Sequence, residues 1–437
     1  MNSSISLRSL LIPTLLLSVN SLAFATDYAG GFSVGVDAKH DDNIRLVDED
    51  REKKTEISGA YISPTLKLDA ATENTQISFD SLFGFGRYNN NDFNTDDIDL
   101  QLALSHRFER SSIGLSSQVR RDTTVTSELT ESGRIGDKAV DHQRYNFSPF
   151  WNYKLNETNQ LRLQAGFRKD NYESKAYRDY SYTTANIDWI HTFNERIQIV
   201  ARGLYSDYET EFSDAPVTRI ISLPFFGEVF IPSTQEIANN STDKGIQLGL
   251  YYLPSEQTSI NLLVGKSRST SKIDARDPND ICNDPIPSPF TYCIAPPDST
   301  SSLLTTEIEA SWEGERNELH ASLSKNTQPT SDGYTMDSGQ LSTSWVFHFS
   351  ELYELQTKIK VIRNRNIGSE NTQVTNRSER NYGSASIRLQ RQLTENWFAN
   401  AEYRYSRQEY LESDYVADSN LILLGIRYTP AQWHWSR

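Results

Sequence analysis

Long hydrophobic runs, cysteine and positive charge are all scarce in this chain of 437 residues. Beyond the first 25 residues, no segment approaches the ~18–20 consecutive apolar residues of a membrane-spanning helix, which excludes a helical transporter. The 43 basic side chains are outnumbered by 58 acidic ones, giving a formal charge of −15. Because proteins that bind nucleic acid usually carry a basic surface, this balance predicts no nucleic-acid partner.

The N-terminus indicates export. Arg8 supplies a positive charge, residues 10–19 form a short apolar core, and residues 23–25 read Ala-Phe-Ala, a typical cleavage site. We therefore predict a signal peptide over residues 1–25 and a mature protein over residues 26–437.

The two cysteines, Cys282 and Cys293, lie close together in one proline-rich stretch, 271–302. In an exported protein this spacing predicts a local disulfide. Two free thiols are the alternative.

Catalytic and metal-binding motifs are also scarce. The chain has neither a G-x-S-x-G elbow nor an H-E-x-x-H motif, and its seven histidines are scattered singly. The triplet His40–Asp42 is a weak candidate for a catalytic or metal-binding group, because adjacent loop residues rarely converge on one site. Segment 92–96 resembles the start of a calcium loop but lacks the glycine and glutamate that complete one. We expect no enzyme, no cofactor and no bound metal.

Alternation of apolar and polar residues, by contrast, runs from Tyr28 to Tyr428. In 99–107, for example, leucines at alternate positions are separated by polar side chains, and the same pattern recurs in 160–170, 353–361 and 397–408. A period of two places these groups on opposite faces of a strand. No stretch has a comparably sustained helical period, so the chain is predicted to be all-β.

Short and long connections alternate along the chain. The short polar turns are Ala71–Asn74, Glu109–Ser111, Asn156–Asn159, Asn194–Arg196, Pro254–Thr258, Gly314–Asn317, Ser350–Leu352 and Thr394–Asn396. The long loops are 39–56, 89–97, 125–142, 173–180, 210–241, 271–302, 328–338, 366–379 and 410–418. These connections predict about 18 strands with both termini at the short-turn end, as in an antiparallel up-and-down barrel of the Gram-negative outer membrane.

Aromatic residues gather near the short turns, where a membrane barrel places its interfacial girdle. They are Phe108, Tyr153, Phe193, Trp312, Phe347, Phe349, Tyr353 and Trp397. A soluble propeller or sandwich shares the alternation, but a propeller would show a blade repeat of ~40–50 residues, and none is found. Residues 26–437 are thus predicted to form one transmembrane barrel, with periplasmic turns and extracellular loops.

A barrel of 16–18 strands encloses an aqueous channel. The basic residues predicted to line its lumen are Arg107, Arg120, Arg162, Arg168, Arg202, Lys358, Lys360, Arg388, Arg404 and Arg427. The acidic residues predicted to face them are Asp80, Asp99, Asp188, Glu307, Glu309, Glu354 and Glu402. This basic excess would favour anionic solutes by focusing the field. Mutual pairing of ordinary wall charges is the alternative.

Loop 210–241 has a centre too apolar to be left in water. Its large apolar residues are Ile220, Ile221, Leu223, Phe225, Phe226, Val229, Phe230 and Ile231. One hypothesis is a gate that folds inward over the pore. The other is a lid that packs on itself, on neighbouring loops or on a partner, without gating.

Segment Gly31–Leu46, in which strand 32–36 is followed by Asp-Asp-Asn-Ile at 41–44, resembles the start of the β-barrel porin 2 family. That family opens with a similar D-x-N-I cluster, and its strand number also fits. The resemblance implies an outer-membrane channel without catalytic residues. In some members the channel is associated with exopolysaccharide or capsule synthesis and serves a periplasmic polysaccharide-export protein.

The C-terminus departs from the usual pattern of such barrels, which end on an aromatic residue. Here Tyr428 is followed by residues 429–437. Either Tyr428 ends the signal for the barrel assembly machinery, or Trp433 and Trp435 serve as the terminal aromatics.

Two functions remain after this reading. The first is a conduit that exports an extracellular or capsular polysaccharide, with outer-membrane lipid, a periplasmic export protein and an anionic polymer as partners. The second is a diffusion porin for small hydrophilic solutes.

Overall fold

A computed structural model describes residues 27–130, 136, 138–211, 213–223, 227–275, 291–293, 299–367, 379–411 and 414–436. The chain is all-β and 3% helical. None of the helices within these ranges is long and apolar enough to cross a membrane. The predicted signal peptide lies outside the described residues, and so does Cys282 of the predicted Cys282–Cys293 disulfide. The signal peptide and the disulfide therefore remain predictions.

The strands follow one another around a single sheet. They are β1 (Asp27–Asp41), β2 (Ile57–Ala71), β3 (Thr75–Tyr88), β4 (Thr95–Arg107), β5 (Ser111–Thr123), β6 (Asp141–Lys154), β7 (Asn159–Tyr172), β8 (Tyr180–Asn194), β9 (Ile197–Thr210), β10 (Ser213–Leu223), β11 (Gly227–Ser255), β12 (Thr258–Ala275), β13 (Thr291–Cys293), β14 (Ser299–Glu313), β15 (Asn317–Pro329), β16 (Thr335–Ser350), β17 (Tyr353–Asn366), β18 (Arg380–Gln392), β19 (Trp397–Tyr410), β20 (Val416–Tyr428) and β21 (Trp433–Ser436). The short helices are η3 (Asn91–Phe93), α1 (Thr124–Ser127) and η4 (Glu128–Thr130).

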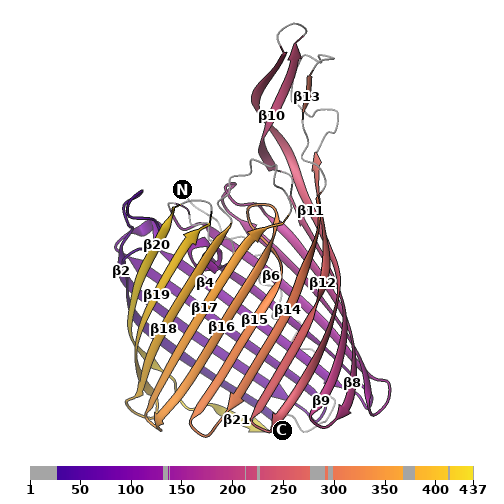
Figure 1. Cartoon of the computed structure of the whole chain (residues 1–437). Helices are drawn as coiled ribbons and strands as arrows, with labels where there is room; N and C mark the ends of the chain where they lie inside the picture. The colour runs from indigo at the N-terminus through magenta and orange to yellow at the C-terminus, as the bar shows by residue number, and fades with distance from the viewer. Residues whose placement is uncertain are drawn as a thin grey trace.

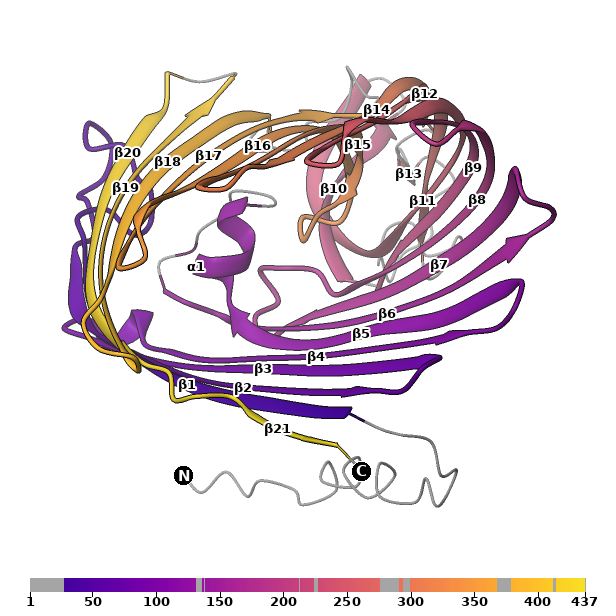
Figure 2. The same ribbon diagram turned by 90° about the horizontal axis from the view of Figure 1, so that it is seen from below.

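Antiparallel pairing closes the sheet into a barrel of 18 strands (Figures 1 and 2). Closure is made by β1 and β20, in a register that runs from Val34 opposite Tyr428 to Asp41 opposite Leu421. Strands β10, β13 and β21 are additions to the barrel wall. The predicted fold class and strand number are confirmed.

The connections also alternate as predicted. The eight short turns join β2 to β3, β4 to β5, β6 to β7, β8 to β9, β11 to β12, β14 to β15, β16 to β17 and β18 to β19. The longer connections all lie at the opposite end of the barrel. Closure leaves the 18-stranded wall without an open edge, which is what a sheet needs in order to cross a bilayer.

The outward face is apolar. Ile246 and Leu248 on β11 are 72% and 68% exposed, and such apolar exposure around a closed barrel is what contact with lipid requires. Near the short turns, exposed Phe193, Trp312 and Trp397 form part of an aromatic girdle. The protein is therefore an outer-membrane β-barrel of a Gram-negative bacterium, with its long loops at the extracellular end.

Two additions extend the wall. At the extracellular end, β10 and the start of β11 form a hairpin that stands above the rim, with β13 paired to β10 (Figure 1). At the periplasmic end, β21 pairs with the start of β1, and the ring of Trp435 stacks on Tyr28 at 4.8 Å between centroids. Tyr428 also pairs in register, so both proposed sets of terminal aromatics belong to the sheet.

Candidate functional site

The polar face of the strands points into the barrel. Arg202 on β9 donates to Glu307 on β14 over 2.9 Å, although β11 and β12 separate these strands along the wall. Such a contact forms only across the interior. The strand registers place the ten predicted basic residues at inward positions: Arg107, Arg120, Arg162, Arg168, Arg202, Lys358, Lys360, Arg388, Arg404 and Arg427.

Many of these charges are paired within the wall. Arg202 also donates to Asp188 at 2.8 Å. Glu402, only 5% exposed, accepts from Arg388 at 2.8 Å and from Arg404 at 2.7 Å. Two guanidinium groups around one carboxylate leave a net positive charge, so pairing reduces the basic excess without abolishing it.

Some inward cations have no such partner. Within the described ranges, Arg107, Lys358 and Arg427 lie beyond 4.0 Å of any carboxylate, and Arg162 donates instead to the amide oxygen of Asn152 at 3.0 Å. The lumen therefore carries positive charges that are not neutralised by any carboxylate whose position the structure describes, at several positions along the barrel axis.

One extracellular connection folds into the barrel. Of the connection from β5 to β6, the structure describes residues 124–130, 136 and 138–140, which we call the inward segment; α1 and η4 belong to it, and Figure 2 shows α1 inside the ring of strands. Its base is closed by a hydrogen bond from the Thr124 amide to the Val140 carbonyl at 2.9 Å. The Thr124 hydroxyl accepts in return from the Val140 amide at 3.2 Å.

Apolar contacts hold the inward segment on three sides of the barrel mouth. Val125 and Ala139 pack against a cluster from the β1–β3 side: Ile44, Ile57, Tyr88 and Phe93. Leu129 packs against a cluster from the β17–β20 side: Leu46, Ile362, Tyr382 and Ala417. Val140 packs against tyrosines from the β7–β9 side: Tyr172, Tyr177, Tyr180 and Tyr208. The inward segment thus crosses the mouth rather than lining one wall.

A buried carboxylate fixes its tip. Glu128 is fully buried, and its two oxygens accept from the Tyr172 hydroxyl at 2.6 Å and from the Ser331 hydroxyl at 2.7 Å. Burying a charge is costly unless hydrogen bonds satisfy it, as they do here. On the far side, the buried guanidinium of Arg380 donates to the Leu129 carbonyl at 2.9 Å.

The base of the inward segment is anchored by a charged network. His142, fully buried, places Nδ1 at 2.8 Å from Asp122 and Nε2 at 2.7 Å from Asp170. Arg144 donates to the same Asp170 at 2.7 Å. Because these residues end β5, begin β6 and end β7, the network joins three neighbouring strands directly under the inward segment.

Loop 330–334, between β15 and β16, carries Ser331 to Glu128. Gly333 has φ 91°, and a side chain there would meet Arg178, so glycine is required at this turn. The Arg178 amide donates to the Ser331 carbonyl at 2.7 Å. Burial lowers the pKa of the Arg178 guanidinium and raises the pKa of the neighbouring Asp179 carboxyl.

The loop proposed as a gate from sequence, 210–241, lies elsewhere. Its backbone forms the β10–β11 hairpin above the rim (Figure 1), while Phe225 and Phe226 lie outside the described residues. The side chains of Ile220, Ile221, Leu223, Val229, Phe230 and Ile231 also lie outside them, so this gating role remains a prediction. The mouth itself is crossed by the inward segment, which sequence reasoning treated as an ordinary loop.

The triplet His40–Asp42 and the segment 92–96, the weak candidates for catalysis and calcium binding, make local contacts within the fold. His40 lies at 2.9 Å from the Ser58 hydroxyl, and the Asp92 carbonyl accepts from the Ala139 amide of the inward segment at 2.9 Å. Among the described residues, no group of three or more His, Cys, Asp and Glu side chains is placed to hold a metal ion.

Comparison with known proteins gives neither a matching family model nor a matching curated sequence. Solved structures similar to this chain include the closed form of the ferric-catecholate import receptor Fiu of E. coli K12, at 8% identity, TM-score 0.44 and coverage of 91% of this chain and 81% of that one. OpdK of Pseudomonas aeruginosa is similar at 10% identity and TM-score 0.40, with 92% and 99% covered. BauA, the ferric preacinetobactin receptor of Acinetobacter baumannii, is similar at 9% identity and TM-score 0.40, with 92% of this chain and 80% of that one covered.

Proposed function

We propose that this barrel is a gated outer-membrane conduit that exports an anionic extracellular polysaccharide, and that it belongs with the β-barrel porin 2 proteins that its first strand resembles. The observation that carries the proposal is the inward segment, which is bound to three sides of the mouth through apolar clusters and the buried Glu128.

Gating distinguishes a conduit from a diffusion porin. A porin stays open, so it needs only a partial constriction. A polymer conduit is wide enough to admit large toxic solutes and therefore has to close when idle. Contacts on three sides favour a segment that closes the mouth over a constriction attached to one wall. A constriction of that kind would need no contact with the opposite wall, whereas here Arg380 of β18 donates to the Leu129 carbonyl.

The lumen chemistry suits an acidic sugar polymer. Arginine and lysine side chains at several heights would attract carboxylate or sulfate groups along the chain, each weakly, so the polymer could slide. Tyrosines gather under the mouth, where Tyr172 and Tyr177 stack at 5.3 Å and Tyr180 lies 5.4 Å from Tyr208. Such rings offer flat faces to sugar rings once the inward segment moves aside. A periplasmic polysaccharide-export protein at the short-turn end would deliver the polymer.

The test uses the full-length protein in a strain that lacks its own copy. We expect deletion to abolish most acidic extracellular polysaccharide. A Lys358→Gln, Arg427→Gln variant should restore it only in part, because it removes inward cations that have no ion pair. The matched control Arg87→Gln, Lys325→Gln removes two cations from the outer surface and should restore it fully.

The paired wall charges favour the second function, a porin with a narrowed mouth. Planar bilayers decide between the two. Steady conductance of the wild-type protein, together with normal polysaccharide in the deletion strain, would replace the conduit with a porin.

A further inference from the structure

Four basic side chains stand on the outward face of β11 and β12, where alternation predicts apolar residues. They are Lys244, Lys266, Arg268 and Lys272, and all four are exposed. Within the described part of the chain none has a carboxylate within 4.0 Å. Lys244 lies directly opposite Arg268 in the strand register. Because like charges at directly opposed positions destabilise a strand pair, this placement is favourable only with an anion nearby.

Along the barrel axis, these cations lie at the level expected for the extracellular surface of the membrane. From the short turn upward, the outward positions of β12 are Ile260, Leu262 and Val264, followed by Lys266 and Arg268. A tilted transmembrane strand crosses the apolar layer in about 9–11 residues. Lys266 and Arg268 therefore stand where the extracellular headgroups begin.

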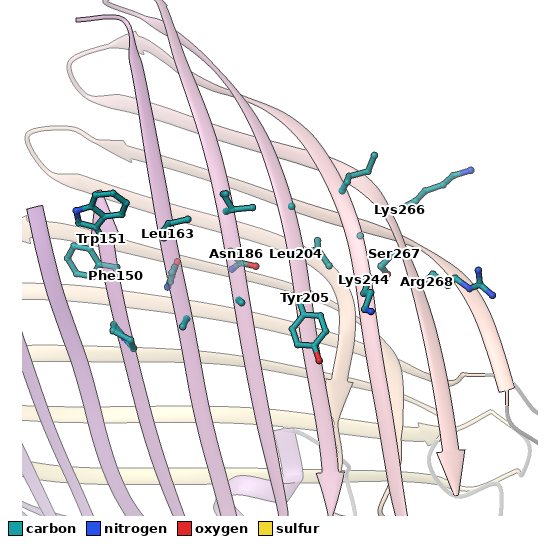
Figure 3. A pocket seen from close by; sticks show the side chains of 18 of the residues that line it. Phe150, Trp151, Leu163, Asn186, Leu204, Tyr205, Lys244, Lys266, Ser267 and Arg268 are labelled. Carbon is teal, nitrogen blue, oxygen red and sulfur yellow. The ribbon is translucent and has the colours of Figure 1, made fainter. Parts of the chain in front are cut away.

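Two hollows on the outer surface adjoin the cations. The smaller, about 380 Å³, is lined by three cross-strand pairs: Asn240 with Lys272, Thr242 with Thr270, and Lys244 with Arg268. The larger, about 1070 Å³, shares Lys244 and Arg268 and extends across an apolar surface that includes Trp151 and Leu163 (Figure 3).

Small outward residues create the depth of the larger hollow. Ala165 lies opposite Ala185, and Gly203 lies opposite Ile187, which leaves a depression between the large side chains of Trp151 and Ile246. One end of the hollow is thus apolar and the other is basic. This is the shape and polarity of a lipid with a charged headgroup.

Three other outward cations near the rim form ion pairs within the protein itself. Arg87 contacts Asp96 at 2.7 Å, Lys169 contacts Glu211 at 3.2 Å, and Lys325 contacts Asp337 at 3.2 Å. Among the acids whose side chains the structure describes, the nearest outward one in register is Asp207 on β9, which accepts from Thr242 at 2.9 Å. The cluster therefore keeps its charge available to a ligand.

We propose that this face binds a phosphate-bearing lipid of the outer leaflet. Its phosphates would lie among Lys244, Lys266, Arg268 and Lys272, and its acyl chains would lie along the larger hollow. Tyr205 completes the headgroup end, since the Lys244 ammonium lies 5.8 Å from the centroid of its ring. A second copy of the chain is a poor occupant, because a two-fold contact through this face would oppose two basic clusters.

The test measures binding of lipopolysaccharide to the purified full-length protein in detergent, by native mass spectrometry. We expect Lys244→Gln, Lys266→Gln, Arg268→Gln to weaken binding by at least tenfold. Lipopolysaccharide stripped of its phosphates should bind the wild-type protein as weakly. Ala185→Leu, which fills the hollow and leaves the cations intact, should weaken binding severalfold. Heat-modifiable migration on gels checks that each variant is folded.

The matched control is Arg87→Gln, Lys169→Gln, Lys325→Gln, which removes the same charge from the paired cations and should bind as the wild type does. Equal weakening in both triple variants would overturn the proposal, since total charge would then be the cause. Undiminished binding of the dephosphorylated lipid would overturn it too. Displacement by millimolar inorganic phosphate would show a free-anion site, and cross-linking of two copies through this face would show a protein interface; either result refutes a lipid site.

Discussion

Replacing Glu128 by alanine should release the inward segment and open the channel. The wild-type carboxylate is fully buried and accepts two hydrogen bonds, from Tyr172 at 2.6 Å and Ser331 at 2.7 Å. Hydrogen bonds to a charged group contribute roughly 1.5–3 kcal/mol each. Water entering the vacated space would recover part of this, so we take about 3 kcal/mol as the net loss to the closed state.

That loss shifts the balance between closed and open states by more than about a hundredfold, because each 1.4 kcal/mol is a factor of ten. A channel open for a small fraction of the time would then be open for much of it. We expect single-channel recordings of Glu128→Ala in planar bilayers to show long openings, and we expect cells carrying it to become sensitive to large antibiotics. Glu128→Gln keeps the shape of the side chain and one acceptor oxygen, so its open time and antibiotic sensitivity should lie between those of the wild type and Glu128→Ala.

Glu173→Ala is the control. Glu173 lies on the extracellular connection that follows Tyr172 and is exposed, so its loss removes an acid from the same end without touching the inward segment. If Glu128→Ala conducts and excludes antibiotics as the wild type does, the inward segment is not the gate. If Glu173→Ala opens the channel equally, the effect comes from surface charge.

Three further outcomes are expected. Replacing Cys282 and Cys293 by serine should hardly change the heat resistance of the barrel on gels, because a disulfide closing so short a loop contributes at most ~2–3 kcal/mol of local ordering; collapse of the barrel on reduction would contradict this. Arg202→Ala should shift the reversal potential in a salt gradient toward cation selectivity, because it leaves two lumen carboxylates unpaired, and an unchanged potential would place these groups away from the ion path. Deleting 433–437 should slow the appearance of the heat-modifiable form in pulse-chase assays without altering conductance, because β21 pairs only with the start of β1.

The barrel was predictable because its determinants are local. Alternation along a single strand sets which face meets lipid, and turn residues between strands set the spacing, so neither requires knowledge of distant parts of the chain. An even strand number also allows the first and last strands to close the barrel in antiparallel pairing, as β1 and β20 do.

The inward segment was not predictable for the opposite reason. Its sequence contains no long apolar run, and the acceptor role of Glu128 depends on Tyr172 and Ser331, which lie 44 and 203 residues away along the chain. The apolar loop 210–241 drew the gating hypothesis because hydrophobic area is visible in sequence, whereas satisfaction of a buried carboxylate is not. The outward cations did leave a signal, since Lys266 and Arg268 interrupt the apolar positions of β12.

The inward segment is held in two ways, and the difference matters for opening. Its base is fixed to the wall by His142 between Asp122 and Asp170, a network inside three paired strands. Its tip is held by Glu128 and by the Leu129 carbonyl, through groups that come from other loops and strands. Opening of the proposed gate would therefore require only the tip contacts to break, while the base and the barrel stay intact. In the proposed export function, an acidic polymer would meet the tip from the periplasmic side, where its acidic groups would compete with Glu128 for the hydrogen-bond donors.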